Sequence, residues 1–260
     1  MSLWQAIILG LIQGLSEFLP VSSSGHVLLF HSILGITTTA DSTLTFIIVL
    51  NMGSLTALLL AFRKDVWALV KKPFQKTTIQ LAVATLPLVF TTLLFMEFIE
   101  LAFYTMRFLS FGFILTGVAL LLSDRIKSNN KDIRSITFVD AVLVGCAQAL
   151  AVLPGISRSG ITITSAMARG IGRENAAKFS FLLSVPAAVG AMVFRLSRDA
   201  SVPALLQDLG LLNLGAGFIA AAVSGYLAIN FMLTIVKKAR LKYFAIYYIL
   251  ALAAYAFLML

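Results

Sequence analysis

Charged residues are scarce in this chain, since Asp, Glu, Lys and Arg together make up only 12% of its 260 residues. Apolar residues make up 60%, and no polar block is long enough to fold as a separate soluble domain. This composition excludes a soluble enzyme and indicates a polytopic membrane protein. The single cysteine, Cys146, excludes an internal disulfide, and we expect it to pack as a small hydrophobic residue.

Acidic residues are fewer than basic ones, and the net charge is +9. Most basic residues lie in four short clusters at the edges of apolar runs: Arg63, Lys64, Lys71, Lys72 and Lys76; Arg125, Lys127, Lys131 and Arg134; Arg169, Arg173 and Lys178; Lys237, Lys238, Arg240 and Lys242. Cytoplasmic loops of membrane proteins carry such clusters. The basic clusters therefore indicate which loops are cytoplasmic, and nucleic acid is not an expected partner.

Two stretches of the chain are apolar but too short to cross a bilayer, because each is interrupted by polar residues. Residues 3–15 precede one interruption, and residues 139–153 precede another. Non-helical backbone at membrane depth is tolerated where protein or water satisfies it, so each stretch and its continuation predict a re-entrant hairpin. Full spans are expected over residues 44–62, 79–98, 103–122, 179–194, 211–236 and 243–260, with Glu97, Glu100 and Arg107 in a non-cytoplasmic loop.

The two interruptions are copies of each other at an offset of 135 residues. This offset superposes Gly10 on Gly145, Gln13 on Gln148, Ser22 on Ser157, Ser24 on Ser159 and Gly25 on Gly160. Three spans separate the copies, an odd number, so the second enters from the opposite face. The sequence predicts an all-α polytopic membrane protein with six transmembrane helices and two re-entrant helical hairpins in an inverted-topology repeat. One integral membrane domain would cover residues 1–260, with repeats over about 1–123 and 136–260.

The first interruption carries an acid, an imidazole and several hydroxyls. Gln13 and Glu17 share one helix face, and Pro20 ends that helix. His26 follows Ser23 by three positions, which would bring an imidazole to a hydroxyl, as an activated nucleophile requires. Ionisable groups at membrane depth usually mark a functional site.

Both interruptions also have the composition of an anion-binding helix start. Ser22, Ser23 and Ser24 before Gly25 can cap one half-helix, and Ser157, Ser159 and Gly160 do the same around Arg158, whose fork suits phosphate oxygens. Taken alone, each serine is more typical of a cap than of a nucleophile. Asn51, Gln148 and Thr162 are expected around the site, with helix-helix hydrogen bonding as an equal alternative.

These motifs resemble those of the undecaprenyl-pyrophosphate phosphatase family of the bacitracin-resistance type. The resemblance rests on residues 13–26 and on the Pro-Gly-Ile-Ser-Arg-Ser-Gly-Ile-Thr segment at 154–162, and it covers the whole chain. It implies hydrolysis of a C55 isoprenoid diphosphate to the monophosphate carrier lipid of peptidoglycan synthesis, at the extracytoplasmic face of the bacterial plasma membrane. It also implies a divalent cation, magnesium or calcium. Many members have Glu at position 13, whereas Gln13 leaves a single carboxylate here.

By the resemblance, Glu17, Ser23, His26 and Arg158 are catalytic, and Glu17 holds the metal. Substrate binding would involve the remaining motif residues: Gln13, Ser22, Ser24, Gly25, Ser157, Ser159, Gly160 and Thr162. We expect Ser23 to attack the terminal phosphorus with His26 as base, or a metal-bound water to replace Ser23. The partners are then a polyprenyl diphosphate and membrane lipids, and a homodimer is left open. The alternative is a transporter or lipid flippase, which an inverted repeat suits equally well.

Overall fold

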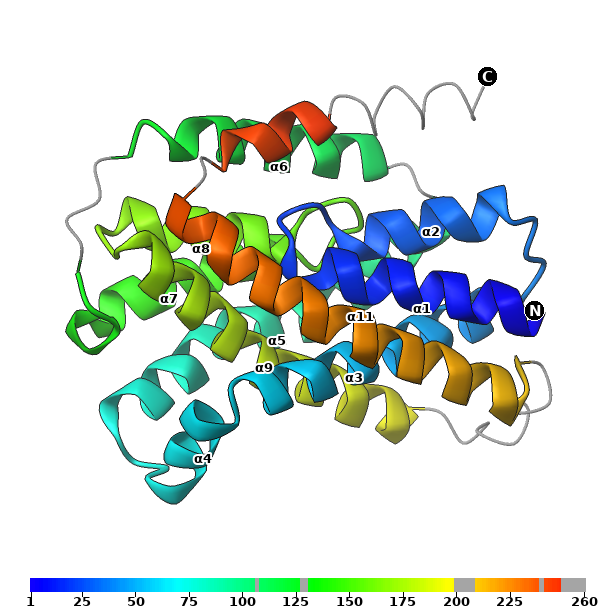
Figure 1. The fold of residues 1–260 in the computed structure, drawn as a ribbon, viewed down its shortest axis with the longest axis horizontal. Coiled ribbons are helices and arrows are strands. Elements are labelled where there is room, and N and C mark those ends of the chain that lie inside the picture. Colours follow the sequence, from blue (N-terminus) through cyan, green and yellow to red (C-terminus); the bar gives the residue numbers. More distant parts are fainter. Residues whose placement is uncertain (106–107, 127–130, 199–208, 239–240, 249–260) are drawn as a thin grey trace.

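The computed structural model describes residues 1–105, 108–126, 131–198, 209–238 and 241–248, and the ordered elements it defines there are helices (Figure 1). In chain order they are α1 (Leu3–Phe18), α2 (Ser23–Ile33), α3 (Ala40–Ala61), α4 (Arg63–Lys71), α5 (Lys76–Thr105), α6 (Leu109–Ser123), the short 3₁₀ helix η1 (Ile133–Ser135), α7 (Phe138–Leu150), α8 (Arg158–Ala168), α9 (Arg173–Arg198) and α11 (Leu211–Lys238). The chain is thus all-helical in its described part, as the sequence predicts.

Among the described residues, four helices are long and apolar enough to cross a membrane, namely α3, α5, α9 and α11. The helices α1, α6 and α7 are apolar but shorter, at 10–17 residues. An α-helix rises 1.5 Å per residue, so these shorter helices do not reach across a hydrocarbon core of about 30 Å unaided. The chain is a membrane protein with long and short apolar helices combined.

The predicted boundary between the second and third spans is wrong. The span expected over residues 103–122 starts later, because α5 continues to Thr105 and α6 begins at Leu109. Consequently Glu97 and Glu100 lie on α5 and not in a loop, beyond the kink where Phe95 has φ −122° and ψ 24°. Arg107 and most of the span expected over 243–260 lie outside the described residues, and residues 242–248 are helical.

The two predicted interruptions are confirmed as helix breaks. The first separates α1 from α2 at residues 19–22, and the second separates α7 from α8 at residues 151–157. An offset of 135 takes the start of α1 to that of α7, both ends of α2 to both ends of α8, and the start of α5 to that of α11. The helical boundaries therefore repeat as the motifs do.

Glycines at equivalent positions allow the two short helices to approach their long partners. A Cβ on Gly10 in α1 would lie 2.4 Å from the carbonyl oxygen of Gly217 in α11. A Cβ on Gly145 in α7 would lie equally close, 2.4 Å, to the carbonyl oxygen of Ala84 in α5. In Figure 1, α1 runs alongside α11, and contacts between these two helices are extensive.

Aromatic rings fix the end of α1 that leads into the first break. Phe18 is 1% exposed and meets Phe181 of α9 edge to face, with ring centroids 5.6 Å apart. Phe181 also contacts Phe62, which follows α3, at 6.1 Å. Cys146, which was expected to pack as a small hydrophobic residue, has an exposed side chain on the apolar helix α7. The rings form a buried support for Glu17, the residue before Phe18.

Candidate active site

The first helix break presents Glu17 and Ser23 to each other. Leu19 has an extended backbone, with φ −73° and ψ 147°, as the residue before a proline prefers, and α1 therefore ends at Phe18. Ser22 adopts the left-handed region, with φ 65°, and α2 starts at the next residue. The Ser22 side chain makes no capping hydrogen bond, contrary to the capping role expected for it.

The second break positions Arg158 by a different local structure. Ser157 is a true N-cap, because its Oγ accepts from the backbone N–H of Gly160 at 3.1 Å. The Ser157 N–H in turn donates to Thr116 Oγ1 of α6 at 2.9 Å. Gly155 has φ 88°, and a Cβ there would lie 2.4 Å from the Leu109 carbonyl oxygen. Arg158 is therefore the first residue of a firmly anchored half-helix.

Glu17 is the centre of a polar network that joins the two breaks. Its Oε1 pairs with the guanidinium of Arg158, which lies 141 residues away in sequence. Its Oε2 accepts from Ser23 Oγ at 2.5 Å and from Gln13 Nε2 at 2.8 Å. The side chains of Glu17 and Arg158 are only 13% and 22% exposed. The predicted convergence of acid, hydroxyl and guanidinium is thus present in the geometry.

His26 departs from the arrangement expected of a base for Ser23. Its Nδ1 lies 2.7 Å from the Ser22 carbonyl oxygen, and its Nε2 lies 2.5 Å from the Tyr247 hydroxyl. The ring stacks on Tyr247 with centroids 5.4 Å apart and also contacts Phe113. Hence the expected contact of the imidazole with the Ser23 hydroxyl is not made, because the imidazole turns toward α6 and the helical residues 242–248.

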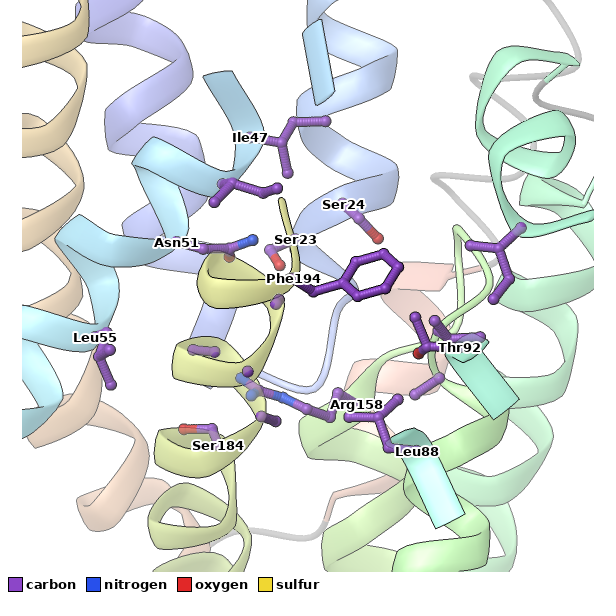
Figure 2. Close-up of a pocket in the computed structure, with 18 of the residues that line it drawn as sticks. Ser23, Ser24, Ile47, Asn51, Leu55, Leu88, Thr92, Arg158, Ser184 and Phe194 are labelled. Atoms are coloured by element: carbon purple, nitrogen blue, oxygen red, sulfur yellow. The ribbon is translucent and has the colours of Figure 1, made fainter. Parts of the chain in front are cut away.

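A cavity of about 600 Å³ opens beside Glu17, Ser23 and Arg158. Figure 2 shows Ser23, Asn51 and Arg158 around this space, together with Thr92, Ser184 and Phe194. Ser22, Ser24 and Ser157 also line it, while most of the wall is apolar, including Ile47, Met52, Leu88, Leu93 and Met96. The cavity therefore combines a small polar end with an extended apolar wall.

Five predicted substrate-binding residues do not line this cavity: Gln13, which hydrogen-bonds to Glu17 and Asn51, and Gly25, Ser159, Gly160 and Thr162, which have packing contacts. Ser159 Oγ donates to the Leu19 carbonyl oxygen at 2.9 Å, and Thr162 Oγ1 lies 2.6 Å from Ser180 Oγ. A Cβ on Gly25 or Gly160 would meet Phe113 or Thr116 side chains at 2.7 and 3.0 Å. Their part in substrate binding stays a prediction.

Tyr247 is not among the site residues that the sequence predicts. Its contact with His26 joins residues 221 positions apart. No spacing or motif signals such a pair. Asn51, by contrast, was expected near the site, and its Oδ1 accepts from Gln13 Nε2 at 2.6 Å.

The oxygen atoms near Glu17 fit a hard divalent cation. Besides the carboxylate, Asn51 Oδ1 is adjacent, and Gln13 Oε1 is buried with no hydrogen-bond partner in the described structure. Carboxylate and amide oxygens are the ligands that magnesium and calcium prefer. Within the described residues no three His, Cys, Asp or Glu side chains gather, so a cation would take its other ligands from phosphate or water.

Comparisons with known proteins decide the family. The model of the family described as bacitracin resistance protein BacA matches residues 6–254. The chain belongs to this family. It is similar to the undecaprenyl-diphosphatase of Carboxydothermus hydrogenoformans, with 45% identity over 95% of this chain and 94% of that protein. Proteins of the same name from Halothermothrix orenii and Methanobrevibacter smithii are 39% and 36% identical, with the same shares covered.

Proposed function

We propose that this protein is an undecaprenyl-diphosphatase, which hydrolyses undecaprenyl diphosphate to undecaprenyl phosphate and inorganic phosphate and so confers bacitracin resistance. The names of its relatives support this activity. The observation that carries it is the Glu17 carboxylate held between the Ser23 hydroxyl and the Arg158 guanidinium, at the polar end of an apolar cavity. An acid, a hydroxyl and a guanidinium there suit an anionic headgroup, and the apolar wall suits an isoprenoid chain.

Arg158 and the start of α8 would bind the diphosphate. A guanidinium carries five N–H donors in a planar fork, and only one of its nitrogens pairs with Glu17. The others can donate to phosphate oxygens, and the positive N-terminal end of α8 adds to the attraction. The prenyl chain would then lie along the wall formed by α3, α5 and α9, whose residues dominate the cavity.

Ser23 would act as nucleophile and Glu17 as general base. At 2.5 Å, Glu17 Oε2 already accepts the Ser23 hydroxyl hydrogen bond and can take its proton as Oγ attacks the terminal phosphorus. The bond from phosphorus to the bridging oxygen breaks, and undecaprenyl phosphate leaves with the proton that Glu17 received, which restores the carboxylate. Water, deprotonated by the same carboxylate, then cleaves the phosphoserine to release inorganic phosphate. A water that attacks the diphosphate directly would give the same products without a phosphoenzyme.

A divalent cation, magnesium or calcium, would be held by Glu17 and the amide oxygen of Asn51. Gln13 turns its Nε2 toward both of them, so its Oε1 would join only after the amide group turns over. When bound, the cation supplies positive charge that offsets the charge of the phosphate oxygens. Gln13 is neutral, so its contribution is a carbonyl oxygen and not a second carboxylate.

The topology we propose has six transmembrane helices and two re-entrant pairs, α1/α2 and α7/α8, in an inverted repeat. The coincident helix boundaries at an offset of 135 and the equivalent glycine contacts support it. The basic residues Lys131, Arg169 and Arg173 flank the second pair and would lie in the cytoplasm. The protein would then reside in the plasma membrane, with its site open to the extracytoplasmic side.

Phosphate release by purified protein in detergent tests the proposal. Hydrolysis of undecaprenyl diphosphate needs no compartments, so wild-type protein should release phosphate, and a chelator should lower the rate. A transporter or flippase would release none. Radiolabel from the terminal phosphate should be trapped on wild-type Ser23 after rapid acid quenching. Full activity in Ser23→Ala would contradict the phosphoserine route and favour direct attack by water.

A further inference from the structure

The hydrogen bonds of His26 determine which ring nitrogen carries the proton. Nδ1 faces the Ser22 carbonyl oxygen at 2.7 Å, and a carbonyl oxygen can only accept. Nδ1 must therefore be the protonated nitrogen. In a neutral ring Nε2 is then the acceptor, and the Tyr247 hydroxyl, 2.5 Å away, donates to it. Tyr247 thus fixes both the tautomer and the orientation of the imidazole.

The hydrogen bond from Nδ1–H is accepted by the carbonyl oxygen of Ser22, a residue whose backbone is strained. Ser22 has φ 65°, the only positive φ of a non-glycine residue in the described chain. Such conformations persist where the surroundings over-determine them. The Ser22 hydroxyl does not do so, because its Oγ is buried without a partner in the described structure. The Ser22 carbonyl accepts from the backbone N–H of His26 at 3.2 Å, as in an ordinary helix turn, and the imidazole is the side chain that adds a second, shorter hydrogen bond to it.

The position of Ser22 matters because it directly precedes the proposed nucleophile. Rotation of the Ser22 backbone toward an ordinary region would swing the first residue of α2 and carry Ser23 Oγ away from Glu17 Oε2. His26 itself is 5% exposed, lies against Phe113 and Tyr247, and is not among the residues that line the cavity. It is therefore placed to act on Ser23 through the backbone.

We propose that His26 is a positioning residue and that Tyr247 is its partner. Tyr247 donates to Nε2, Nδ1–H donates to Ser22, and the held carbonyl keeps the left-handed turn that aims Ser23 at Glu17. This role rests on the proposed phosphatase function. It removes His26 from the proton transfer and gives residue 247, in the last described helical segment, a part in the reaction.

Substitutions of His26 separate positioning from base catalysis. The amide nitrogen of Asn lies near the place of Nδ1, so His26→Asn can still donate to Ser22, whereas Gln reaches the place of Nε2 and cannot. We expect His26→Asn to keep kcat within about tenfold of wild type, and His26→Gln and His26→Ala to lose about 10²-fold, the scale of a small misplacement of a reacting group. If His26→Asn is as inactive as His26→Ala, the proposal is overturned, because a lost base affects both alike.

The partner is tested by Tyr247→Phe, with Tyr243→Phe as the matched control. Tyr243 lies on the same helical segment but is 59% exposed. Loss of one hydrogen bond should lower kcat about fivefold to tenfold in Tyr247→Phe, with KM unchanged. Tyr243→Phe should stay within about twofold. Equal rates in the two variants would remove Tyr247 from the proposal.

The dependence of kcat on pH gives a further test of His26. The fall of kcat at low pH should be the same in His26→Asn as in wild type. If that fall is lost in His26→Asn, His26 is the base and the proposal is overturned.

Nitrogen NMR tests the tautomer without any activity. The chain has two histidines, so ¹⁵N-histidine labelling gives two rings, and His31→Gln assigns the remaining one. We expect the His26 proton on Nδ1 in wild type, with a changed Nε2 shift in Tyr247→Phe. A proton on Nε2 with a bare Nδ1 would overturn the inference. Wild-type protein that releases no phosphate would contradict the proposed function, while the NMR result would still decide the His26 contacts.

Discussion

The two helix breaks share a sequence pattern and equivalent helix boundaries, yet they carry different functional side chains at equivalent positions. At the offset of 135, Glu17 corresponds to Val152, Ser23 to Arg158 and His26 to Ile161. The first break thus holds the carboxylate and the hydroxyl, and the second holds the guanidinium. The comparison teaches that the repeated backbone supplies two facing half-helices, whereas the chemistry arises where the copies differ.

The largest effect should come from the carboxylate that only the first break has. Glu17→Gln removes the proton acceptor of Ser23 and the partner of Arg158, and we expect kcat to fall about 10³-fold, within the range of general acid-base catalysis. Steady-state phosphate release measures it. Glu97→Gln is the matched control, because Glu97 is exposed on α5 and should stay within about twofold. Retention of wild-type kcat in Glu17→Gln would contradict Glu17 as base.

The guanidinium that only the second break has should give the next largest effect. Arg158→Lys keeps the charge but loses the planar fork, so we expect kcat/KM for undecaprenyl diphosphate to fall about 10²-fold. Arg63→Lys, at an exposed position at the start of α4, controls for the substitution itself. If the two variants behave alike, phosphate binding by the Arg158 fork is ruled out.

The close packing of α1 on α11 and of α7 on α5 is tested by substituting the equivalent glycines Gly10 and Gly145. Gly10→Ala and Gly145→Ala each place a Cβ 2.4 Å from a partner carbonyl, so each should lower the free energy of unfolding by about 1–3 kcal/mol. Thermal unfolding in detergent measures it. Gly215→Ala on α11 meets nothing within 4 Å and should not lower the melting temperature. A strong effect at only one of Gly10 and Gly145 would break the equivalence of the two contacts.

The smallest effect should distinguish the serines that precede the two half-helices. Ser157→Ala removes an N-cap and should cost about 1 kcal/mol of stability, whereas Ser22 makes no capping bond and Ser22→Ala should cost under about 0.5 kcal/mol. The same unfolding assay compares them. Equal losses would show that Ser22 also caps its helix in the membrane.

The helix breaks and their meeting were predictable from the sequence for physical reasons. Pro20 forces an extended residue before it, and a partly buried Arg158 needs an anionic partner, which the carboxylate of Glu17 in the other break supplies. The cavity wall follows from the apolar runs. These features depend on residue chemistry and short-range geometry, which the sequence carries directly.

Two features depended on information that no local pattern carries. The His26 rotamer is decided by Tyr247, which tertiary packing alone brings near. The end of α5 was misjudged because Glu97 and Glu100 suggested a loop, yet a 30-residue helix is about 45 Å long and extends well past a hydrocarbon core of about 30 Å. The helix kinks at Phe95 and then resumes to Thr105, so Glu97 and Glu100 can reach the polar region without ending α5.

The hydrogen bond from Ser159 to the Leu19 carbonyl has a consequence for biosynthesis. Together with the pair of Arg158 and Glu17, it closes the site only after the second half of the chain has entered the membrane. Until then Glu17 has its hydrogen bonds from Ser23 and Gln13 but lacks its guanidinium partner, and the Leu19 carbonyl lacks the Ser159 hydroxyl. The proposed site is therefore complete only when both halves of the chain are present and docked against each other.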